Sequence, residues 1–167
     1  MTTENWYALR VRSRHEFATS EELRRKNIEN FLPSVSRVRQ WKDRKKAVVF
    51  PLFPGYLFVR IDPQPGAFLN VLKTRGSVNF VSLEPGQPTS VSPEEIGALN
   101  AMLKSGEEID VFPAFKHGTA VRVKNGPLRG TVGILAKRED RHMFLINIDI
   151  LGRSVGLKIC AEDVELA

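Results

Sequence analysis

Cysteine is nearly absent from this sequence of 167 residues, and so are long hydrophobic runs. The single cysteine, Cys160, cannot form an intramolecular disulfide, which fits a reducing compartment. The apolar runs are too short to cross a membrane, and the N-terminus lacks both the basic and the apolar region of a signal peptide. We therefore expect a cytoplasmic protein with no membrane partner.

Patterns typical of catalysis are also missing. His15, His117 and His142 fall in three separate contexts, and none has a cysteine or carboxylate at metal-ligand spacing. Cys160 lies in a β-rich segment, which favours a small core residue over a nucleophile. Neither a P-loop nor a Rossmann glycine pattern occurs. The sequence predicts a protein that is not an enzyme and that uses no metal and no cofactor.

Positive charge is concentrated in one segment. The net charge of +6 permits binding to a polyanion without requiring it. Residues 37–46 hold six lysines and arginines against one acid, whereas residues 84–110 hold six acids against one lysine. The basic segment is either a solvated loop or a nucleic-acid surface, on which the cations neutralise phosphates and Trp41 stacks on an unpaired base.

The segment 51–59, PLFPGYLFV, is rich in aromatic and proline rings. Pro54-Gly55 predicts a turn, after which Tyr56 and Phe58 share one face of a strand and Leu57 and Val59 the other. Both faces are apolar. Such a strand is either buried on both sides or keeps one face open for a partner.

The first hundred residues predict a mixed α+β unit. An S-x-x-E capping box at Ser13 and Glu16 predicts a helix that runs to about Asn27. Ser92, followed by proline and two glutamates, predicts the start of another helix. Extended runs are expected at 6–12, 31–38, 47–50 and 78–81, with a hairpin tip at 39–46 and a short helix at 66–73.

The last fifty residues predict an SH3-like β-barrel. Short β-rich runs at 119–124, 131–138, 143–150 and 154–159 are separated by glycine and charged turns. Residues 104–114 show no sustained period and are the best linker candidate. We expect a domain at 1–105, a flexible linker at 106–115 and a barrel at 116–167.

An N-terminal and a C-terminal motif together resemble the NusG family of transcription elongation factors over nearly the whole chain. The N-terminal (NGN) domain is matched by Trp6-Tyr7, Phe53-Pro-Gly-Tyr56 and the Ser92-Pro-Glu-Glu-Ile helix start. The C-terminal KOW barrel is matched by G-x-x-V-R-V-x-x-G-P-L-x-G-x-x-G at 118–133. Residues 51–59 and 74–76 resemble the specialised RfaH-type branch, from which residues 67–69 depart.

The resemblance implies an NGN sheet with packed helices, a KOW barrel, and sites for several partners. In the family, an NGN pocket binds the clamp helices of the RNA polymerase β′ subunit, and a turn of the barrel binds a small-subunit ribosomal protein or Rho. The matching positions are Tyr7, Phe53, Tyr56 and Phe58 for the clamp, and Ile150, Leu151, Gly152 and Arg153 for the barrel partner. Alternatively, some of these residues are simply core.

The resemblance also implies two basic sets that bind nucleic acid. In the first, the positions that match family contacts with non-template DNA are Arg12, Arg25, Thr74 and Arg75, with Arg14 and Lys26 as near neighbours. The second is the hairpin tip, expected beside upstream DNA or nascent RNA: Arg39, Trp41, Lys42, Arg44, Lys45 and Lys46. The resemblance thus implies a monomeric bacterial transcription antitermination factor. The alternative is an RNA- or ribosome-binding module that acts without polymerase.

Overall fold

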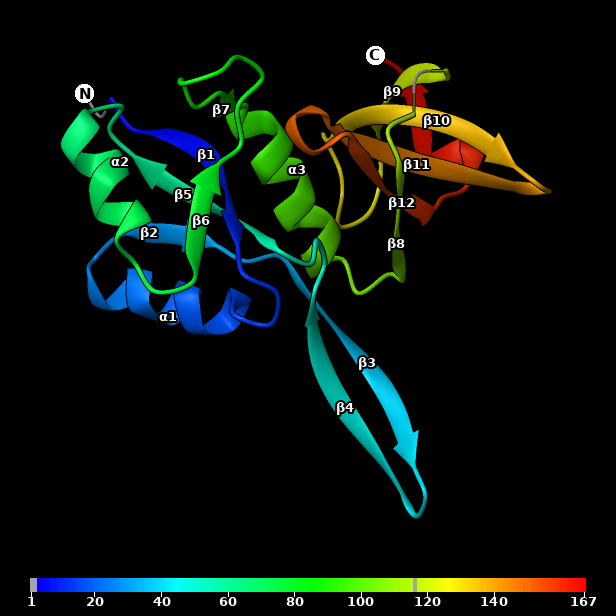
Figure 1. Cartoon of the computed structure of the whole chain (residues 1–167). Helices are drawn as coiled ribbons and strands as arrows, with labels where there is room; N and C mark the ends of the chain where they lie inside the picture. The colour runs from blue at the N-terminus through cyan, green and yellow to red at the C-terminus, as the bar shows by residue number, and fades with distance from the viewer. Residues whose placement is uncertain (1–2, 116) are drawn as a thin grey trace. The chain divides into compact units, whose positions relative to one another are not determined.

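The computed structural model describes residues 3–115 and 117–167 (Figure 1). The chain divides into two compact units, Met1–Val91 and Ser92–Ala167. Each unit is described here by itself. The predicted α+β class is confirmed, because the first unit combines a sheet with helices and the second contains an all-antiparallel sheet.

The sheet of the first unit is built around β1 (Asn5–Val11). It is antiparallel throughout: β1 pairs with β5 (Tyr56–Ile61), β6 (Ser77–Phe80) and β7 (Ser90–Val91), and β5 also pairs with β2 (Glu29–Phe31). The alternating side chains Tyr7, Leu9 and Val11 of β1 join Leu57 and Val59 of β5 in one buried cluster. Burial of these apolar side chains holds the sheet against the helices.

Two helices complete this unit, α1 (Glu16–Arg25) and α2 (Pro65–Leu72). The second confirms the short helix predicted at 66–73. The predicted capping box is wrong, because His15 is the N-cap and makes no side-chain cap hydrogen bond. Glu16 is buried, and its carboxylate instead accepts a hydrogen bond of 3.3 Å from the Gly55 amide.

The predicted basic hairpin is present as a two-stranded ribbon. It consists of β3 (Ser34–Trp41) and β4 (Arg44–Pro51), paired in register from Ser34 opposite Pro51 to Trp41 opposite Arg44. Only Lys42 and Asp43 form the turn, so most of the predicted tip lies within the strands. Figure 1 shows the ribbon projecting away from the sheet of its own unit.

The second unit begins with α3 (Pro93–Lys104), which starts as predicted. The Ser92 hydroxyl accepts hydrogen bonds from the amides of Glu94 and Glu95 at 3.2 and 3.4 Å. These bonds satisfy two of the amides that a helix leaves unpaired at its first turn. In the described part of the chain, no helix is both long enough and apolar enough to cross a membrane.

A six-stranded antiparallel sheet forms the rest of this unit, in the order β13-β9-β10-β11-β12-β8. The four predicted runs are β9 (Thr119–Val123), β10 (Val132–Arg138), β11 (Arg141–Ile148) and β12 (Arg153–Lys158), and β13 (Val164–Leu166) is additional. The segment predicted as a linker is not irregular throughout: β8 (Ile109–Pro113) lies within it and pairs with β12. The domain boundary at residue 105 stays a prediction.

Candidate functional site

Three of the four aromatic residues predicted to contact a partner are buried. The exposed fractions are 4% for Tyr7, 1% for Phe53 and 0% for Phe58, whereas Tyr56 is half-buried. These positions therefore do not form one exposed aromatic surface in this structure. Tyr56 is the accessible member, and the assignment of the set to a partner stays a prediction.

The buried aromatic rings fill both faces of the sheet. On one face, the Tyr7 ring packs edge-on against Phe68, with centroids 5.1 Å apart, and against Phe80. On the other face, Phe58 packs edge-on against Phe53 at 6.5 Å and is stacked with Phe31 at 6.3 Å. The strand β5, predicted to be apolar on both faces, therefore lies between two aromatic clusters. Tyr56 is its first residue.

The first predicted basic set surrounds the place where α1 contacts the turn after α2, which is called the α1 joint below. The Lys26 ammonium donates to the Thr74 hydroxyl at 3.0 Å and to the Asn70 carbonyl at 3.1 Å. The Arg12 amide donates to the Gly76 carbonyl at 2.8 Å. These contacts bring Arg12, Lys26 and the turn bearing Arg75 together, although they are far apart in sequence.

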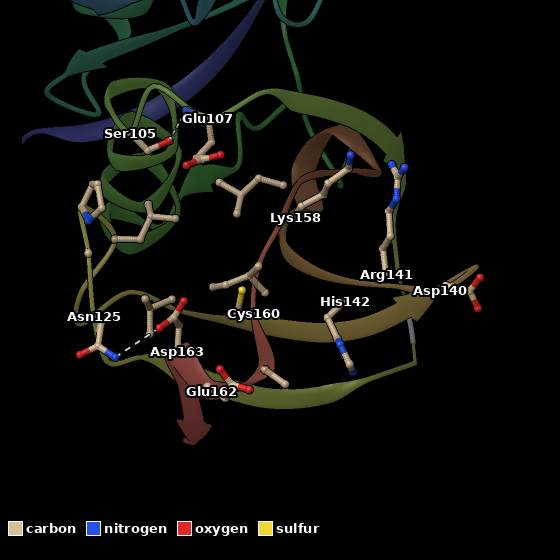
Figure 2. A pocket seen from close by; sticks show the side chains of 17 residues that line it. Ser105, Glu107, Asn125, Asp140, Arg141, His142, Lys158, Cys160, Glu162 and Asp163 are labelled. Carbon is tan, nitrogen blue, oxygen red and sulfur yellow. Dashed lines mark hydrogen bonds between the residues drawn. The ribbon is translucent and has the colours of Figure 1, made fainter.

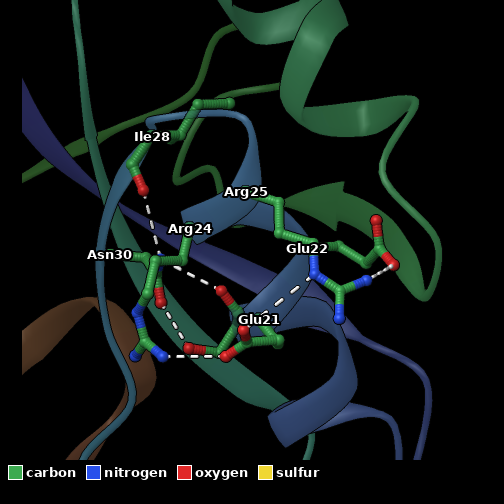
Figure 3. Close-up of polar contacts among 7 residues, drawn as sticks. Glu21, Glu22, Arg24, Arg25, Ile28 and Asn30 are labelled. Atoms are coloured by element: carbon green, nitrogen blue, oxygen red, sulfur yellow. Dashed lines mark hydrogen bonds and ion pairs between the residues drawn. The ribbon is translucent and has the colours of Figure 1, made fainter.

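Acidic neighbours partly neutralise the positive charge of one member of this set, Arg25. Arg25 lies 3.3 Å from a carboxylate oxygen of Glu22 and 4.0 Å from one of Glu21 (Figure 3). All three side chains are exposed enough for solvent to weaken these ion pairs. Arg14, at a φ of 67°, lies in the turn before α1 and is exposed. The joint therefore offers several solvent-facing cations, of which Arg25 is partly neutralised.

The second basic set lies along the ribbon. Every residue from Ser36 to Ala47 is exposed, and Trp41 exposes 50% of its surface. The guanidinium of Arg39 lies 4.7 Å from the centroid of the Phe50 ring, a cation–π contact that fixes this side chain along the strand. The predicted cations are thus displayed to solvent.

The predicted partner site of the C-terminal sheet is the connection from β11 to β12. Asp149–Leu151 form one turn of 3-10 helix, and Gly152 follows with a φ of 62°, a left-handed conformation that glycine adopts readily. Ile150, Leu151 and Arg153 are half-buried, while Gly152 is exposed. The two apolar side chains are accessible to a partner only in part.

An open hollow of about 860 Å³ also lies in the second unit, lined by side chains of mixed charge (Figure 2). His142 and Cys160 both line it. Cys160 is exposed, so the prediction of a core cysteine is wrong; it lies after the end of β12, outside the strand whose side chains are buried. Within the described residues, no group of three histidine, cysteine or acidic side chains could hold a metal ion.

Sequence reasoning missed the residues that position these sites. The Thr19 hydroxyl donates to the Arg75 carbonyl, a partner 56 residues away, and the Glu16 carboxylate binds the Gly55 amide. Glu95 of α3 faces Asp149, and burial together with this neighbouring carboxylate raises the pKa of Glu95 to about 7. No local pattern signals such pairs, because each joins distant segments.

The two units differ in charge. Residues 1–91 hold 15 lysines and arginines against 8 acids, whereas residues 92–167 hold 10 against 11. The excess positive charge of the protein therefore belongs to the first unit, which carries both predicted basic sets. A surface of this kind attracts phosphate backbones.

Comparison with known proteins identifies the family. A family model described as "Transcription termination factor nusG" matches residues 4–100. The protein "Transcription termination/antitermination protein NusG" of Borreliella burgdorferi is 25% identical over 96% of this chain and 97% of its own length. The protein of the same name from Staphylococcus aureus is 30% identical over 97% of this chain and 95% of its own length.

A solved structure described as "Domain interaction in Thermotoga maritima NusG" shares the fold. It matches with a TM-score of 0.56 and 24% identity, over 97% of this chain and 96% of that one. The family model alone covers more than half of the chain. The order of sheet, helices and second antiparallel sheet agrees with that match. The chain therefore belongs to the NusG family of non-enzymatic transcription factors.

Proposed function

We propose that this protein is a transcription elongation factor that binds bacterial RNA polymerase through its N-terminal unit and suppresses pausing or termination. The observation that carries the proposal is the similarity, over almost the whole chain, to proteins named for transcription termination and antitermination. The basic character of the first unit supports a role beside nucleic acid. The protein acts as a monomer in the cytoplasm.

The polymerase contact is assigned to the clamp helices of the β′ subunit. Tyr56, half-buried at the start of β5, supplies the accessible ring, and Phe58, two residues further along the same strand, packs edge-on against Phe53. Tyr7 braces the opposite face of the same sheet. Partly exposed tyrosines held by a rigid core are typical anchors of protein interfaces.

The basic sets are assigned to upstream or non-template DNA. Cations around the α1 joint and along the ribbon would neutralise phosphates on two sides of the N-terminal unit. A protein that bridges the polymerase clamp and the upstream duplex would disfavour the paused conformation, because it binds the active one better. This is how binding alone, without catalysis, would suppress pausing.

The C-terminal domain is assigned a second partner, a small-subunit ribosomal protein or Rho. The apolar side chains of Ile150 and Leu151, beside Gly152 and Arg153, supply the contact. A tether to the polymerase-bound domain would hold that partner at a high local concentration. The resemblance of residues 51–59 and 74–76 to the RfaH-type branch supports a specialised role.

The test is binding of core RNA polymerase by the full chain, by residues 1–105, and by two matched variants. Tyr56→Ser removes the accessible ring, whereas Phe17→Ser removes a ring that is 46% exposed on α1. We expect Tyr56→Ser to weaken binding roughly tenfold and Phe17→Ser to leave it unchanged. Equal binding by a folded Tyr56→Ser protein would reject the assigned anchor.

The same experiment tests the mechanism as a whole. If neither the full chain nor the fragment binds RNA polymerase, the elongation mechanism is wrong. Strong RNA binding would then favour a ribosome- or RNA-binding module.

A further inference from the structure

The strand β11 carries apolar side chains on both of its faces. Its sequence runs Met143-Phe144-Leu145-Ile146 without a polar residue. Because successive side chains of a strand point to opposite faces, Phe144 and Ile146 share one face, and Met143 and Leu145 share the other. A sheet that has one face in water usually alternates apolar with polar residues instead. The C-terminal sheet therefore has a second apolar face.

Neighbouring strands extend this second face. Ala136 and Ile134 of β10 lie opposite Met143 and Leu145. On the other side of β11, Leu145 lies opposite Gly156 of β12. The apolar residues of this face form one cluster, here named the Met143 face: Ala136, Met143 and Leu145 are buried, and Phe112, Phe115 and Ile134 pack against them.

The Met143 face contains a hollow of about 260 Å³. Except for Arg138, all of the side chains that line it within the described residues are apolar. Water occupies such a space poorly, because it finds few polar partners there. The hollow is smaller than the sites of drug-sized ligands, which measure roughly 300–1,000 Å³. Its size and lining therefore suit one large apolar side chain.

Hydrogen bonds hold one wall of the hollow in place. The side chain of Asn147 pairs with both backbone groups of Phe115. The Ser154 hydroxyl, which is fully buried, donates to the Pro113 carbonyl at 3.1 Å. A wall that is ordered before binding loses little conformational entropy when a ligand enters. The hollow is therefore a preformed site.

Two arginines give the rim of the hollow a positive charge. The Arg138 guanidinium lies 4.8 Å from the centroid of the Phe112 ring, and Arg141 lies directly opposite Arg138 across the hairpin. Like charges in opposed positions destabilise a strand pair. In the part of the chain that the structure describes, neither arginine forms an ion pair with a carboxylate. A carboxylate from outside the chain would relieve this repulsion.

The acids of this region line an adjoining hollow. Glu107, Glu108 and Asp110 belong to β8 and the segment before it, and Glu139 belongs to the hairpin turn. A carboxylate of a ligand would be repelled by these groups and attracted by the arginines. The charges therefore define which part of the rim an acidic ligand can approach.

We propose that the Met143 face binds an acidic segment of another protein, which inserts one large apolar side chain into the hollow and places a carboxylate against Arg138 and Arg141. Apolar anchors in pockets supply most of the affinity of such interfaces, and charges at the rim add orientation. A nucleic-acid strand would use the cations and leave the apolar hollow empty. The inference goes beyond the proposed function, because this face is separate from the turn at 150–153 that was assigned to the second partner.

The Met143 methyl group can report on binding. The sequence contains three methionines, Met1, Met102 and Met143, and Met102 is fully buried on α3, which makes it an internal control. The full chain, with carbon-13 in its methionine methyl groups, is titrated with a short synthetic peptide that has one phenylalanine between two pairs of glutamates. We expect a saturable shift of the Met143 resonance and no shift of the Met102 resonance.

Two altered peptides test the two halves of the proposed chemistry. One has alanine in place of the phenylalanine, and the other has lysines in place of the glutamates. We expect each to bind at least roughly fivefold more weakly than the first peptide, because the alanine leaves the hollow unfilled and the lysines are repelled by the arginines.

Neighbouring cations of β10 provide matched protein variants. Arg138→Gln neutralises the rim, whereas Lys137→Gln makes the same change on the opposite face. We expect Arg138→Gln to weaken peptide binding roughly fivefold and to make it less sensitive to salt. Lys137→Gln should leave both quantities near the wild-type values. Ala136→Leu fills the hollow and should weaken binding at least roughly tenfold in a protein whose circular dichroism is unchanged.

Several results would overturn the inference. These are absence of a saturable Met143 shift, equal binding of the alanine peptide, and equal effects of Arg138→Gln and Lys137→Gln. If the Met143 resonance moves on dilution without peptide, a second copy of the chain covers the face and the inference is wrong. It is also wrong if a single-stranded DNA oligonucleotide shifts the Met143 resonance as the peptide does, because the face then binds polyanions in general.

Discussion

The Thr19 hydroxyl on α1 donates a 2.8 Å hydrogen bond to the backbone carbonyl of Arg75, in the turn between α2 and β6. Thr19 is fully buried and Arg75 is exposed, so the bond is partly shielded from water. It sets the distance between α1 and the turn and thereby the position from which the Arg75 side chain projects. The basic surface around this joint therefore depends on a partly buried contact between uncharged groups.

Gly76 should not tolerate a side chain, because the turn that contains it packs closely against α1. Its φ is +89°, and an added Cβ would clash with the Thr19 hydroxyl and lie 3.1 Å from the His15 Cβ. Gly86, with a φ of +83° and open space around it, is the matched control. We expect Gly86→Ala to cost about 1 kcal/mol of unfolding free energy, from backbone strain alone. Gly76→Ala should cost about 2–4 kcal/mol, because overpacking adds to that strain.

Urea denaturation followed by tryptophan fluorescence measures this difference, since both tryptophans lie in the first unit. Equal costs for the two substitutions would show that α1 moves aside without penalty. In that case the Thr19 contact would not set the geometry of the joint.

Local chemistry in the sequence accounts for much of the fold. The Ser92 cap, the alternation in β1 and the hairpin are all specified by residues within a few positions of one another. The prediction from sequence failed where a partner distant in the chain determines the local structure. Glu16 does not complete a capping box because its carboxylate is taken by the Gly55 amide, 39 residues away. Similarly, β8 is a strand because β12 offers it an edge.

The candidate sites divide in the same way. The exposed cations of the ribbon follow from a dense charged segment, residues 37–46, that no core could accept. The aromatic set was harder, since apolar faces look alike in sequence whether they are core or interface. Phe53 and Phe58 are buried and pack against each other, and Phe58 is also stacked with Phe31, a residue distant in the sequence.

This burial predicts different roles for neighbouring aromatics. Phe58→Ala should destabilise the first unit by about 3–5 kcal/mol, since it opens a cavity at a fully buried position. Tyr56→Ser, at a half-buried position, should cost about 1–2 kcal/mol. Tryptophan-detected urea denaturation compares the two. Similar costs would indicate that the two rings are equally embedded, and Tyr56 would lose its place as the accessible anchor.

Asn147 on β11 should control whether residues 114–115 stay attached to the C-terminal sheet. Its side chain accepts a 3.1 Å hydrogen bond from the Phe115 amide and donates a 2.8 Å bond to the Phe115 carbonyl. Asn147→Ala removes both bonds, so we expect amide exchange at Phe115 to accelerate roughly 10- to 100-fold.

The control for Asn147 is Asn125→Ala, which removes one exposed hydrogen bond to Asp163. Exchange at Phe115 should not change in that variant. If Asn147→Ala also leaves the rate unchanged, the pairing of β8 with β12 is sufficient to hold the segment.

The Glu95 carboxyl should make the stability of the second unit depend on pH. Burial and the nearby Asp149 carboxylate raise the pKa of Glu95 from 4.5 to about 7 in the folded chain. The folded state therefore binds a proton that the unfolded state has already lost between these two values. Stability should fall as the pH rises from about 4.5 to about 7 and then level off, by about 1–2 kcal/mol because solvent screens this half-buried group.

Glu95→Gln should abolish that fall. Glu94→Gln is the control, because the Ser92 hydroxyl lowers the pKa of Glu94 and gives the opposite sign: stability is lost as the pH falls. Denaturation at a series of pH values is followed by far-ultraviolet circular dichroism, which reports on both units, and by tryptophan fluorescence, which reports on the first unit alone; the transition of the second unit is the one that fluorescence does not show. A pH profile that Glu95→Gln leaves unaltered would mean that the carboxyl is solvated in the folded protein, and that α3 does not press it against the turn at Asp149.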